Sequence, residues 1–225
     1  MSSFKDVVGH KNIIKYISSA VQADAVSHAY ILNGERGSGK RLLANLFAMS
    51  LQCQNRAEDG EACGKCQSCK QAQSGNQPDI IKVTHEKPNT IGVGDIRTQV
   101  NDDIMIRPYS SYYKIYIVDE AEKMTVQAQN ALLKTMEEPP SYVIFILATT
   151  EVHKIPITVL SRCQRYDFKR ITIQTLTARL KELSEAEGID VEDKALTYIA
   201  KAADGSMRDA LSLLDQCVAF HFGER

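Results

Sequence analysis

The sequence contains no tryptophan, no apolar run long enough to cross a membrane, and no large excess of charge of either sign. Its longest purely apolar run covers residues 143–148, whereas a membrane-spanning helix needs about 20 residues. No apolar stretch follows a basic start at the N-terminus, so we expect no signal peptide. These absences exclude an integral membrane protein and predict a cytoplasmic protein with no membrane partner.

The balance of charge also limits how the protein can act on nucleic acid. The chain has 27 basic and 28 acidic residues, for a net charge of −1. A protein that grips nucleic acid by itself usually carries a basic excess or a basic face. We therefore expect any contact with DNA to be shared with partner proteins.

Apolar runs alternate with helical patterns over the first 170 residues. Uninterrupted apolar runs predict buried strands, and apolar residues spaced three or four apart predict helices. Strands are expected over residues 29–32, 80–83, 114–118, 142–148 and 165–168. Helices are expected over 12–23, 40–53 and 126–138, and around Ile96, Val100 and Ile104. The alternation predicts an α/β fold with a parallel sheet covered on both faces.

The pattern changes near residue 171, beyond which we expect only helices. They should cover residues 173–187, 191–203 and 206–220. We therefore expect an α/β domain over residues 1–170 and a small three-helix domain over 171–225. The sequence stops without a recognisable closing element, which favours a shortened form of a longer protein.

A glycine-rich segment lies between the first expected strand and the helix after it. Gly34, Gly37, Ser38, Gly39 and Lys40 fit the motif G-x-x-x-x-G-K. Such a loop turns its backbone amides toward phosphate oxygens, and its lysine reaches the β- and γ-phosphates. The alternative is a glycine-rich turn without a ligand. The strand–loop–helix setting favours a phosphate loop that binds ATP or ADP.

The next residue departs from the motif. A serine or threonine normally follows the lysine, and its hydroxyl is a ligand of Mg²⁺; this chain has Arg41. A guanidinium has only donors and stays charged, so it cannot bind a cation. Nucleotide with Mg²⁺ remains possible, because Mg²⁺ relies mainly on phosphates and water. We expect productive hydrolysis to be weak or absent.

Two carboxylates, Asp119 and Glu120, follow the expected strand at 114–118. In phosphate-loop hydrolases such a pair orients the metal and polarises the attacking water. Two acids after a strand are also typical of a helix N-terminus. Their position downstream of the phosphate loop favours the catalytic interpretation.

Four of the six cysteines are Cys53, Cys63, Cys66 and Cys69. Four thiolates complete a tetrahedral zinc shell without an open position, as in structural zinc sites. The segment around them is too polar to form a core, so we expect a structural Zn²⁺ to stabilise an inserted zinc knuckle. Cys163 and Cys217 lie outside this set and are expected to be small buried residues.

Together these motifs resemble a known family. The chain is similar to the bacterial clamp-loader subunits of DNA polymerase III, the tau/gamma and delta-prime subunits, over about residues 4–220. The resemblance is carried by the cysteine segment and by residues 6–10, 27–30, 130–134, 137–140, 147–150 and 161–163. It implies an AAA+ P-loop NTPase fold with an inserted zinc knuckle and a helical lid. It also implies a further helical collar domain, which we expect to be absent from this sequence.

The resemblance implies roles for further residues. Arg162 matches the arginine finger that reaches the nucleotide of a neighbouring subunit; its alternative is an ion pair within the chain. Thr149 or Thr150 matches the position that senses the γ-phosphate. Arg208 matches the lid arginine, or is a solvated helix residue. The implied partners are the other clamp-loader subunits (tau/gamma and delta) and, through the assembled complex, the sliding clamp and primer–template DNA.

The type of subunit depends largely on Arg41. Motor subunits of the tau/gamma type keep threonine there, so Arg41 favours the delta-prime type, a stator with weak or no ATPase of its own. Residues 85–91 are also more similar to delta-prime. The alternative is an ATP-hydrolysing tau/gamma-type motor, since Lys40, Asp119 and Glu120 are intact. In either case the subunit has no polymerase site of its own.

Overall fold

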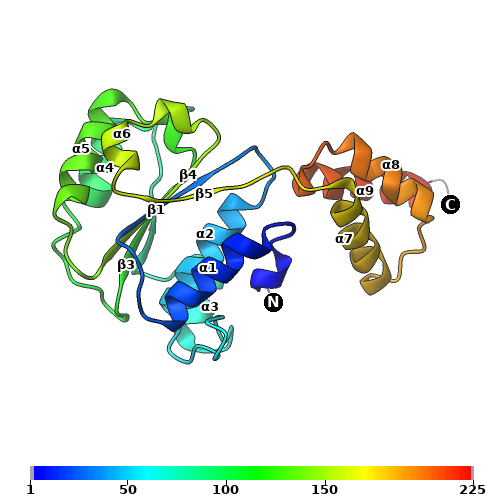
Figure 1. Cartoon of the computed structure of the whole chain (residues 1–225), viewed down its shortest axis with the longest axis horizontal. Helices are drawn as coiled ribbons and strands as arrows, with labels where there is room; N and C mark the ends of the chain where they lie inside the picture. The colour runs from blue at the N-terminus through cyan, green and yellow to red at the C-terminus, as the bar shows by residue number, and fades with distance from the viewer. Residues whose placement is uncertain (1–2, 224–225) are drawn as a thin grey trace.

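The computed structural model describes the backbone of residues 3–223 and the side chains of residues 3–220. The outermost ends of the two expected domains, residues 1–2 and 224–225, lie outside the described residues. The chain folds into an α/β part and a separate helical part (Figure 1).

Five strands form one parallel sheet in the order β2-β3-β4-β1-β5. They are β1 (Ala29–Asn33), β2 (Ile80–Lys82), β3 (Lys114–Val118), β4 (Val143–Thr149) and β5 (Gln164–Asp167). Each begins and ends within one residue of its expected range. The predicted parallel sheet is therefore confirmed.

The three central strands divide their side chains between two cores. In β3, for example, Ile115 and Ile117 point to one core while Tyr116 and Val118 point to the other. This follows because successive side chains of a strand point to opposite faces. Buried strands of a parallel sheet therefore appear in sequence as continuous apolar runs.

Helices cover both faces of the sheet (Figure 1). One face carries α1 (Lys11–Gln22), α2 (Lys40–Leu51) and α3 (Gln67–Ser74). The other carries α4 (Val93–Ile96), the π-helical turn η2 (Arg97–Asn101), α5 (Val126–Glu137) and α6 (Ile157–Leu160). Short 3₁₀ turns are η1 (Phe4–Asp6), η3 (Ala121–Lys123) and η4 (Val152–Lys154).

Three of these helices differ from expectation, the simplest case being the one-turn helix α6, which was not predicted from the sequence. The helix expected around Ile96, Val100 and Ile104 is a short α-helix that continues as the wider turn η2. Its apolar residues are spaced four and four apart, longer than the 3.6 residues of an α-helical turn. The polar segment with the cysteines contains α3, which apolar periodicity did not predict.

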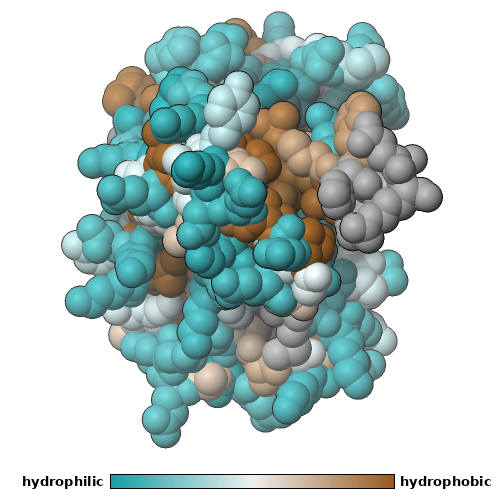
Figure 2. All heavy atoms as spheres, turned by 90° about the vertical axis from the view of Figure 1, so that its right-hand side faces the viewer, coloured by the Kyte–Doolittle hydropathy of each residue, from teal (hydrophilic) through white to brown (hydrophobic). Residues whose placement is uncertain are grey.

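Three helices form the helical part: α7 (Ile173–Ala186), α8 (Asp193–Ala202) and α9 (Met207–Gly223). They enclose a core of their own, which includes Leu176, Leu180, Leu196 and Leu214. Viewed from the end of the molecule formed by these helices, the surface is mostly hydrophilic around a central hydrophobic area (Figure 2). Within the described residues, no helix has both the length and the apolar character needed to span a bilayer.

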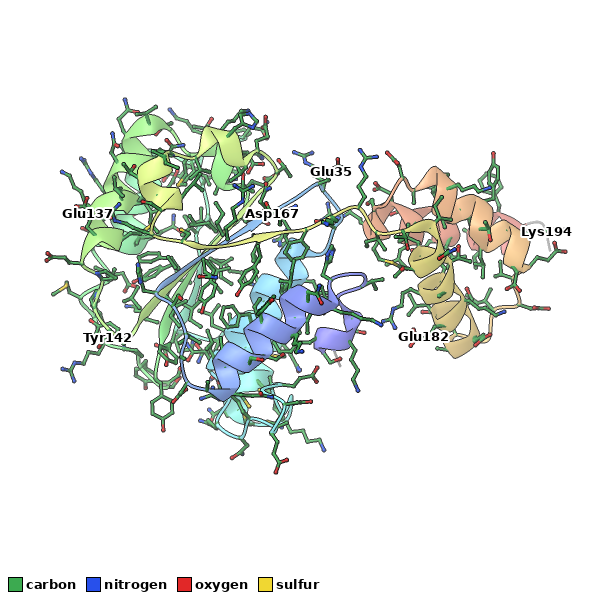
Figure 3. The ribbon with its side chains drawn as sticks, viewed as in Figure 1. Glu35, Glu137, Tyr142, Asp167, Glu182 and Lys194 are labelled. Carbon is green, nitrogen blue, oxygen red and sulfur yellow. The ribbon has the colours of Figure 1, made fainter. Side chains whose placement is uncertain are left out.

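The helical part meets the α/β part at the glycine-rich loop. The Met207 amide donates to the carbonyl of Gly37 at 3.2 Å. Arg170, between β5 and α7, donates to Glu35 Oε1 at 2.9 and 3.0 Å and to Asp204 Oδ2 at 2.5 Å. Figure 3 shows Glu35 close to the junction of the two parts. The glycine-rich loop, the segment between β5 and α7, and the helical part thus contact one another directly.

Candidate functional site

The glycine-rich loop has the geometry of a phosphate loop. It joins the carboxyl end of β1 to the start of α2 at Lys40. Gly37 has a φ of +76° and Gly39 a φ of +97°, a region that only glycine adopts without a steric penalty. The Ser38 hydroxyl donates to the carbonyl of Glu35 at 2.8 Å, which tightens the turn.

Lys40 is buried at the start of α2, and its Nζ donates to the carbonyls of Gly34 and Glu35 at 2.6 Å each. Burial lowers the pKa of this ammonium, and the carboxylates of Asp119 and Glu122 offset part of that effect. A buried cation at a helix N-terminus favours an anionic ligand.

The carboxylates after β3 face this loop. Arg41 Nε lies 3.4 Å from Asp119 Oδ2, and Arg36 Nη2 lies 3.4 Å from Glu120 Oε1. Lys123 Nζ also lies 2.6 Å from Glu120. Glu120 has a φ of +51°, which is uncommon for a residue with a side chain and concentrates at functional sites. The predicted acidic pair is thus next to the phosphate loop, with both carboxylates already paired.

Glu122 belongs to the same site, although the sequence motif did not single it out. Its carboxylate accepts hydrogen bonds from the hydroxyls of Thr149 (2.8 Å) and Thr150 (2.7 Å). Burial alone would raise the pKa of Glu122, but these hydrogen bonds, with backbone amides, hold the pKa below its ordinary value. The threonines at the end of β4 therefore face a carboxylate as well as the cavity.

His10 is a second residue that the sequence did not reveal. It is buried, with Nε2 3.0 Å from the Ser38 carbonyl and its ring centroid 4.4 Å from that of Phe168. Burial lowers the pKa of its imidazole, and the hydrogen bond to Ser38 opposes that shift. His10 thus contacts the backbone of the phosphate loop at Ser38 and helps to fix the loop.

These groups surround a cavity of about 570 Å³, which we call the phosphate-loop cavity. The helical part contributes Met207 and Arg208 from the start of α9. The α/β part contributes Arg36, Gly37, Gly39, Lys40, Arg41, Leu42, Asn45, Asp119, Glu120, Glu122, Ala148, Thr149 and Thr150. All but two of the residues predicted to bind or process nucleotide in this chain line it. Gly34 and Ser38 do not line it but shape the loop.

Arg162 lies elsewhere, between α6 and β5, and does not line this cavity. Its Nη1 donates to the carbonyl of Thr158 at 2.7 Å, and its Nη2 lies 3.5 Å from Glu137 Oε1. Figure 3 labels Glu137 on the side of the α/β part that lies away from the helical part α7–α9. Both interpretations from the sequence are compatible with this place, because an exposed ion pair of this length is weak.

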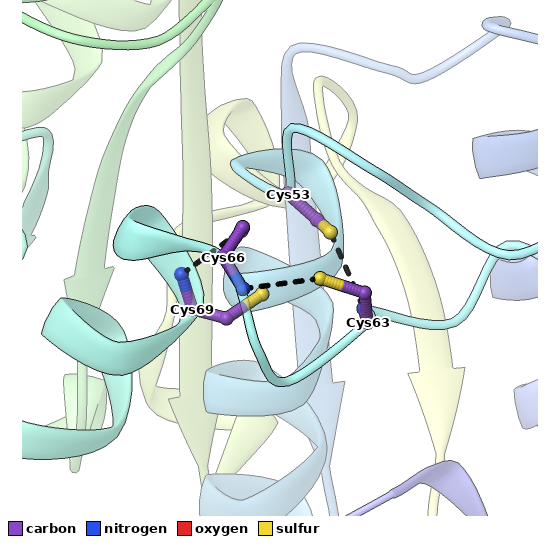
Figure 4. Close-up of side chains that lie close together, drawn as sticks. All are labelled: Cys53, Cys63, Cys66 and Cys69. Atoms are coloured by element: carbon purple, nitrogen blue, oxygen red, sulfur yellow. Dashed lines mark hydrogen bonds between the residues drawn. The ribbon is translucent and has the colours of Figure 1, made fainter.

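The four clustered cysteines converge on one point (Figure 4). Their Sγ atoms all lie within 4.8 Å of one another. A tetrahedral ion with Zn–S bonds of about 2.3 Å places its sulfurs roughly 3.8 Å apart. Backbone amides of Cys63, Cys66 and Cys69 donate to the sulfurs of Cys53, Cys63 and Cys66 at 3.3–3.4 Å. The arrangement suits a structural zinc ion.

The environment of the sulfurs differs across this cluster. Amides of Lys65 and Cys66 lower the pKa of Cys63 to about 6, whereas burial raises that of Cys69. Of the remaining cysteines, Cys163 is partly buried and burial raises its pKa to about 12. Cys217 is exposed on α9, so the expectation that it is buried is wrong. An amphipathic helix places one side in solvent, and Cys217 falls there.

Two family models match the chain. The model described as "DNA polymerase III, delta subunit" matches residues 9–172. The model described as "DNA polymerase III clamp loader subunit, ATPase lid domain" matches residues 175–223.

Curated relatives align with nearly the whole chain. It is 47% identical to DNA polymerase III subunit tau of Bacillus subtilis, over 96% of this chain and 38% of that protein. It is 41% identical to subunit gamma/tau of Mycoplasma pneumoniae, over 97% of this chain and 31% of that protein. It is 36% identical to subunit tau of Escherichia coli, over 99% of this chain and 34% of that protein. The chain thus spans about a third of the length of these relatives.

Solved structures share the fold. A gamma subunit-related protein of DNA polymerase III from Thermotoga maritima has a TM-score of 0.54 at 23% identity, covering 84% of this chain and 56% of that one. The RuvB Holliday junction branch migration motor of the same organism has a TM-score of 0.66 at 20% identity, covering 95% and 63%. The predicted AAA+ P-loop fold, with a sheet followed by a helical lid, is confirmed.

Proposed function

Because this chain belongs to the clamp-loader family of DNA polymerase III, we propose that it is a tau/gamma-type subunit that binds ATP in the phosphate-loop cavity. The names of the relatives support this type, which was the alternative from the sequence. They do not support the delta-prime type that Arg41 favoured. Identity over nearly the whole chain outweighs Arg41 and the short segment of residues 85–91.

The observation that carries the proposal is the convergence of anion-binding groups around one cavity. Lys40 lies at its base, where the N-terminus of α2 adds its partial positive charge. Arg208 reaches it from the lid, and Thr149 reaches it from the end of β4. These positions suit the phosphates of ATP, with Lys40 on the β- and γ-phosphates and Arg208 closing the site from the other side.

The subunit acts as part of an assembly. Its partners are the other clamp-loader subunits, and through them the sliding clamp and primer–template DNA. A net charge of −1 fits a subunit that shares DNA contacts rather than gripping DNA alone. In this assembly Arg162 completes the nucleotide site of a neighbour, and a structural zinc ion on the four clustered cysteines folds the segment between α2 and β2.

One observation favours a second candidate. The ion pair between Arg41 and Asp119 engages the carboxylate that orients the metal in related hydrolases. A subunit built this way hydrolyses little ATP itself and serves its neighbour through Arg162. That is the stator role, with nucleotide binding retained.

Hydrolysis in the assembled complex separates the two candidates. We expect the wild-type chain to bind ATP and Lys40→Ala to lose at least roughly tenfold in affinity, because the lysine contacts the phosphates. If Arg41 is all that limits turnover, Arg41→Thr will raise hydrolysis at this site by roughly tenfold or more. The measurements are calorimetric ATP binding by the full chain, and hydrolysis by complexes whose other phosphate-loop lysines are replaced. A wild-type chain that binds no ATP contradicts the proposal. Wild-type hydrolysis at the rate of a motor subunit contradicts the stator, and binding without any gain in Arg41→Thr shows that Arg41 does not limit turnover.

A further inference from the structure

In this chain, the residues at the two positions that hold Mg²⁺ in phosphate-loop proteins form an ion pair with each other. These positions are the residue after the loop lysine and the aspartate at the end of the neighbouring strand. Here they are Arg41 and Asp119, and Arg41 Nε lies 3.4 Å from Asp119 Oδ2. The guanidinium thus lies between α2 and β3, where the ion's two protein contacts would be. These residues do not fit magnesium.

The chemistry of arginine keeps a positive charge at this position. A guanidinium has five N–H donors, no acceptor, and a charge that it keeps at every working pH. It offers a divalent ion no ligand and repels it. The carboxylate of Asp119, the remaining ligand, is already neutralised by its neighbour.

The other acidic groups of the cavity are engaged as well. Glu120 pairs with Lys123 and Arg36, and Glu122 accepts hydrogen bonds from Thr149 and Thr150. The basic side chains that line the cavity outnumber the acidic ones: Arg36, Lys40, Arg41 and Arg208 against Asp119, Glu120 and Glu122. The cavity therefore suits a polyanion that is not already neutralised by a metal.

Arg41 is also placed to contact such an anion. Its side chain is 66% exposed, and it lines the cavity one residue beyond Lys40. Because a guanidinium presents a planar fork, it can keep one N–H toward Asp119 while others point to phosphate oxygens.

We propose that the phosphate-loop cavity binds ATP or ADP free of Mg²⁺, with the Arg41 guanidinium as the built-in counter-cation. The nucleotide is then a retained ligand that fixes the loop and the lid, and this site does not hydrolyse it. This inference rests on the proposed nucleotide binding and adds the form in which the nucleotide is held.

Calorimetry on the full chain tests the proposal, with ATP and ADP titrated in EDTA and in excess Mg²⁺. We expect the wild-type affinity in EDTA to equal that in Mg²⁺ within about threefold, or to exceed it. Arg41→Thr restores the hydroxyl ligand and removes the charge. It should bind at least roughly tenfold more tightly with Mg²⁺ than in EDTA.

Two matched variants separate charge at this position from charge in general. Arg165→Ala removes an exposed arginine outside the cavity, one that pairs with Asp167, and should leave the ratio of the two affinities unchanged. Arg41→Gln removes the charge without adding a hydroxyl, and should bind weakly in both buffers. As an independent readout, Mn²⁺ paramagnetic resonance should show a protein-bound ion with Arg41→Thr and ATP, but only nucleotide-bound ion in solution with wild type.

The outcomes distinguish this inference from the function on which it rests. Wild-type binding that weakens at least roughly tenfold in EDTA overturns metal-free binding and leaves the nucleotide site standing. An absence of binding in both buffers, by wild type and Arg41→Thr alike, overturns both.

Discussion

The two candidate metal sites of this molecule differ in where their positive charge comes from. In the cysteine cluster, four sulfurs lie within 4.8 Å of one another, and amides donate to three of them. In the phosphate-loop cavity, the chain itself supplies a cation, Arg41, beside the carboxylate of Asp119. The first arrangement suits a bound ion, whereas in our proposal the second replaces one with a side chain.

The difference shows that a motif does not define a site by spacing alone. Both segments have the spacing of a metal-associated motif, C-x-x-C steps in one and G-x-x-x-x-G-K in the other. What separates them is the chemistry of a single position. A thiolate is a zinc ligand, while a guanidinium at the place of a hydroxyl offers magnesium no ligand.

The largest effect on stability should come from breaking the cysteine cluster. Cys69→Ser removes a fully buried sulfur, so we expect zinc to be lost and the thermal midpoint to fall by roughly 10 °C. That shift corresponds to about 3 kcal/mol of unfolding free energy in a chain of this size. It is a fraction of what zinc contributes in small zinc peptides, which is on the order of 10 kcal/mol. Elemental analysis and thermal unfolding measure both.

Cys217→Ser is the matched control for that substitution. Its thiol is exposed on α9 and outside the cluster, so neither zinc content nor midpoint should change. A wild-type chain with far less than one zinc per molecule would break the comparison, as would stability indifferent to a chelator.

The next prediction extends the comparison to a second arginine, Arg162. We propose that this residue acts in the nucleotide site of a neighbouring subunit and not in the cavity of its own chain. Arg162→Ala should lower hydrolysis at the site it completes by roughly 10³-fold, because a fixed guanidinium stabilises charge on the γ-phosphoryl group. Assembly should survive, since the contacts of Arg162 in this chain are one carbonyl and one exposed carboxylate. Single-turnover hydrolysis in a complex with only that site competent, together with gel filtration, measures both.

Arg165→Ala is the control, because Arg165 lies on β5 close by and pairs with Asp167 in its own chain. Arg162→Lys should rescue poorly, since an ammonium lacks the planar fork. Undiminished hydrolysis in an intact Arg162→Ala complex would remove this residue from the mechanism.

The smallest effect concerns acid. The folded-state pKa of Glu122 lies below its ordinary 4.5, so its contribution to stability is present above pH 4.5 and is lost as pH falls through the folded value. Glu122→Gln should therefore cost about 1 kcal/mol near pH 7 and progressively less below pH 4.5. Denaturant unfolding at several pH values measures this difference.

The exposed Glu182→Gln is the control and should change stability little at any of these pH values. A gap between wild type and Glu122→Gln that stayed constant down to pH 3 would show that the hydrogen bonds to Thr149 and Thr150 do not require an ionised carboxylate.

The three central strands, β1, β3 and β4, were predictable from the sequence because they are buried on both faces of the sheet. The continuous runs at residues 114–118 and 142–148 carry the information for their own conformation. In contrast, α3 reads as a polar segment, and its order comes from the cysteines: Cys66 caps it and Cys69 is buried against α2. No apolar period marks such a helix.

At the site, motifs predicted the residues that the chain places locally but not those that the fold brings in. Gly34 to Arg41 and the pair Asp119–Glu120 follow known spacings. Glu122 gains its role only through the threonines of β4, which are 27 and 28 residues away. His10 depends in the same way on Ser38, 28 residues further along. Such contacts require the tertiary structure.

The parallel register of the sheet also fixes the positions of the site residues that follow its strands. Asn33 pairs with Thr149 across β1 and β4, and Val118 pairs with Leu147 across β3 and β4. One residue of strand spans about 3.3 Å, so deleting a residue within β4 would withdraw the Thr149 hydroxyl from Glu122 by more than a hydrogen bond's length. It would also exchange the residues facing the two cores, for example Phe145 for Ile146. We therefore expect insertions and deletions within the strands to be poorly tolerated.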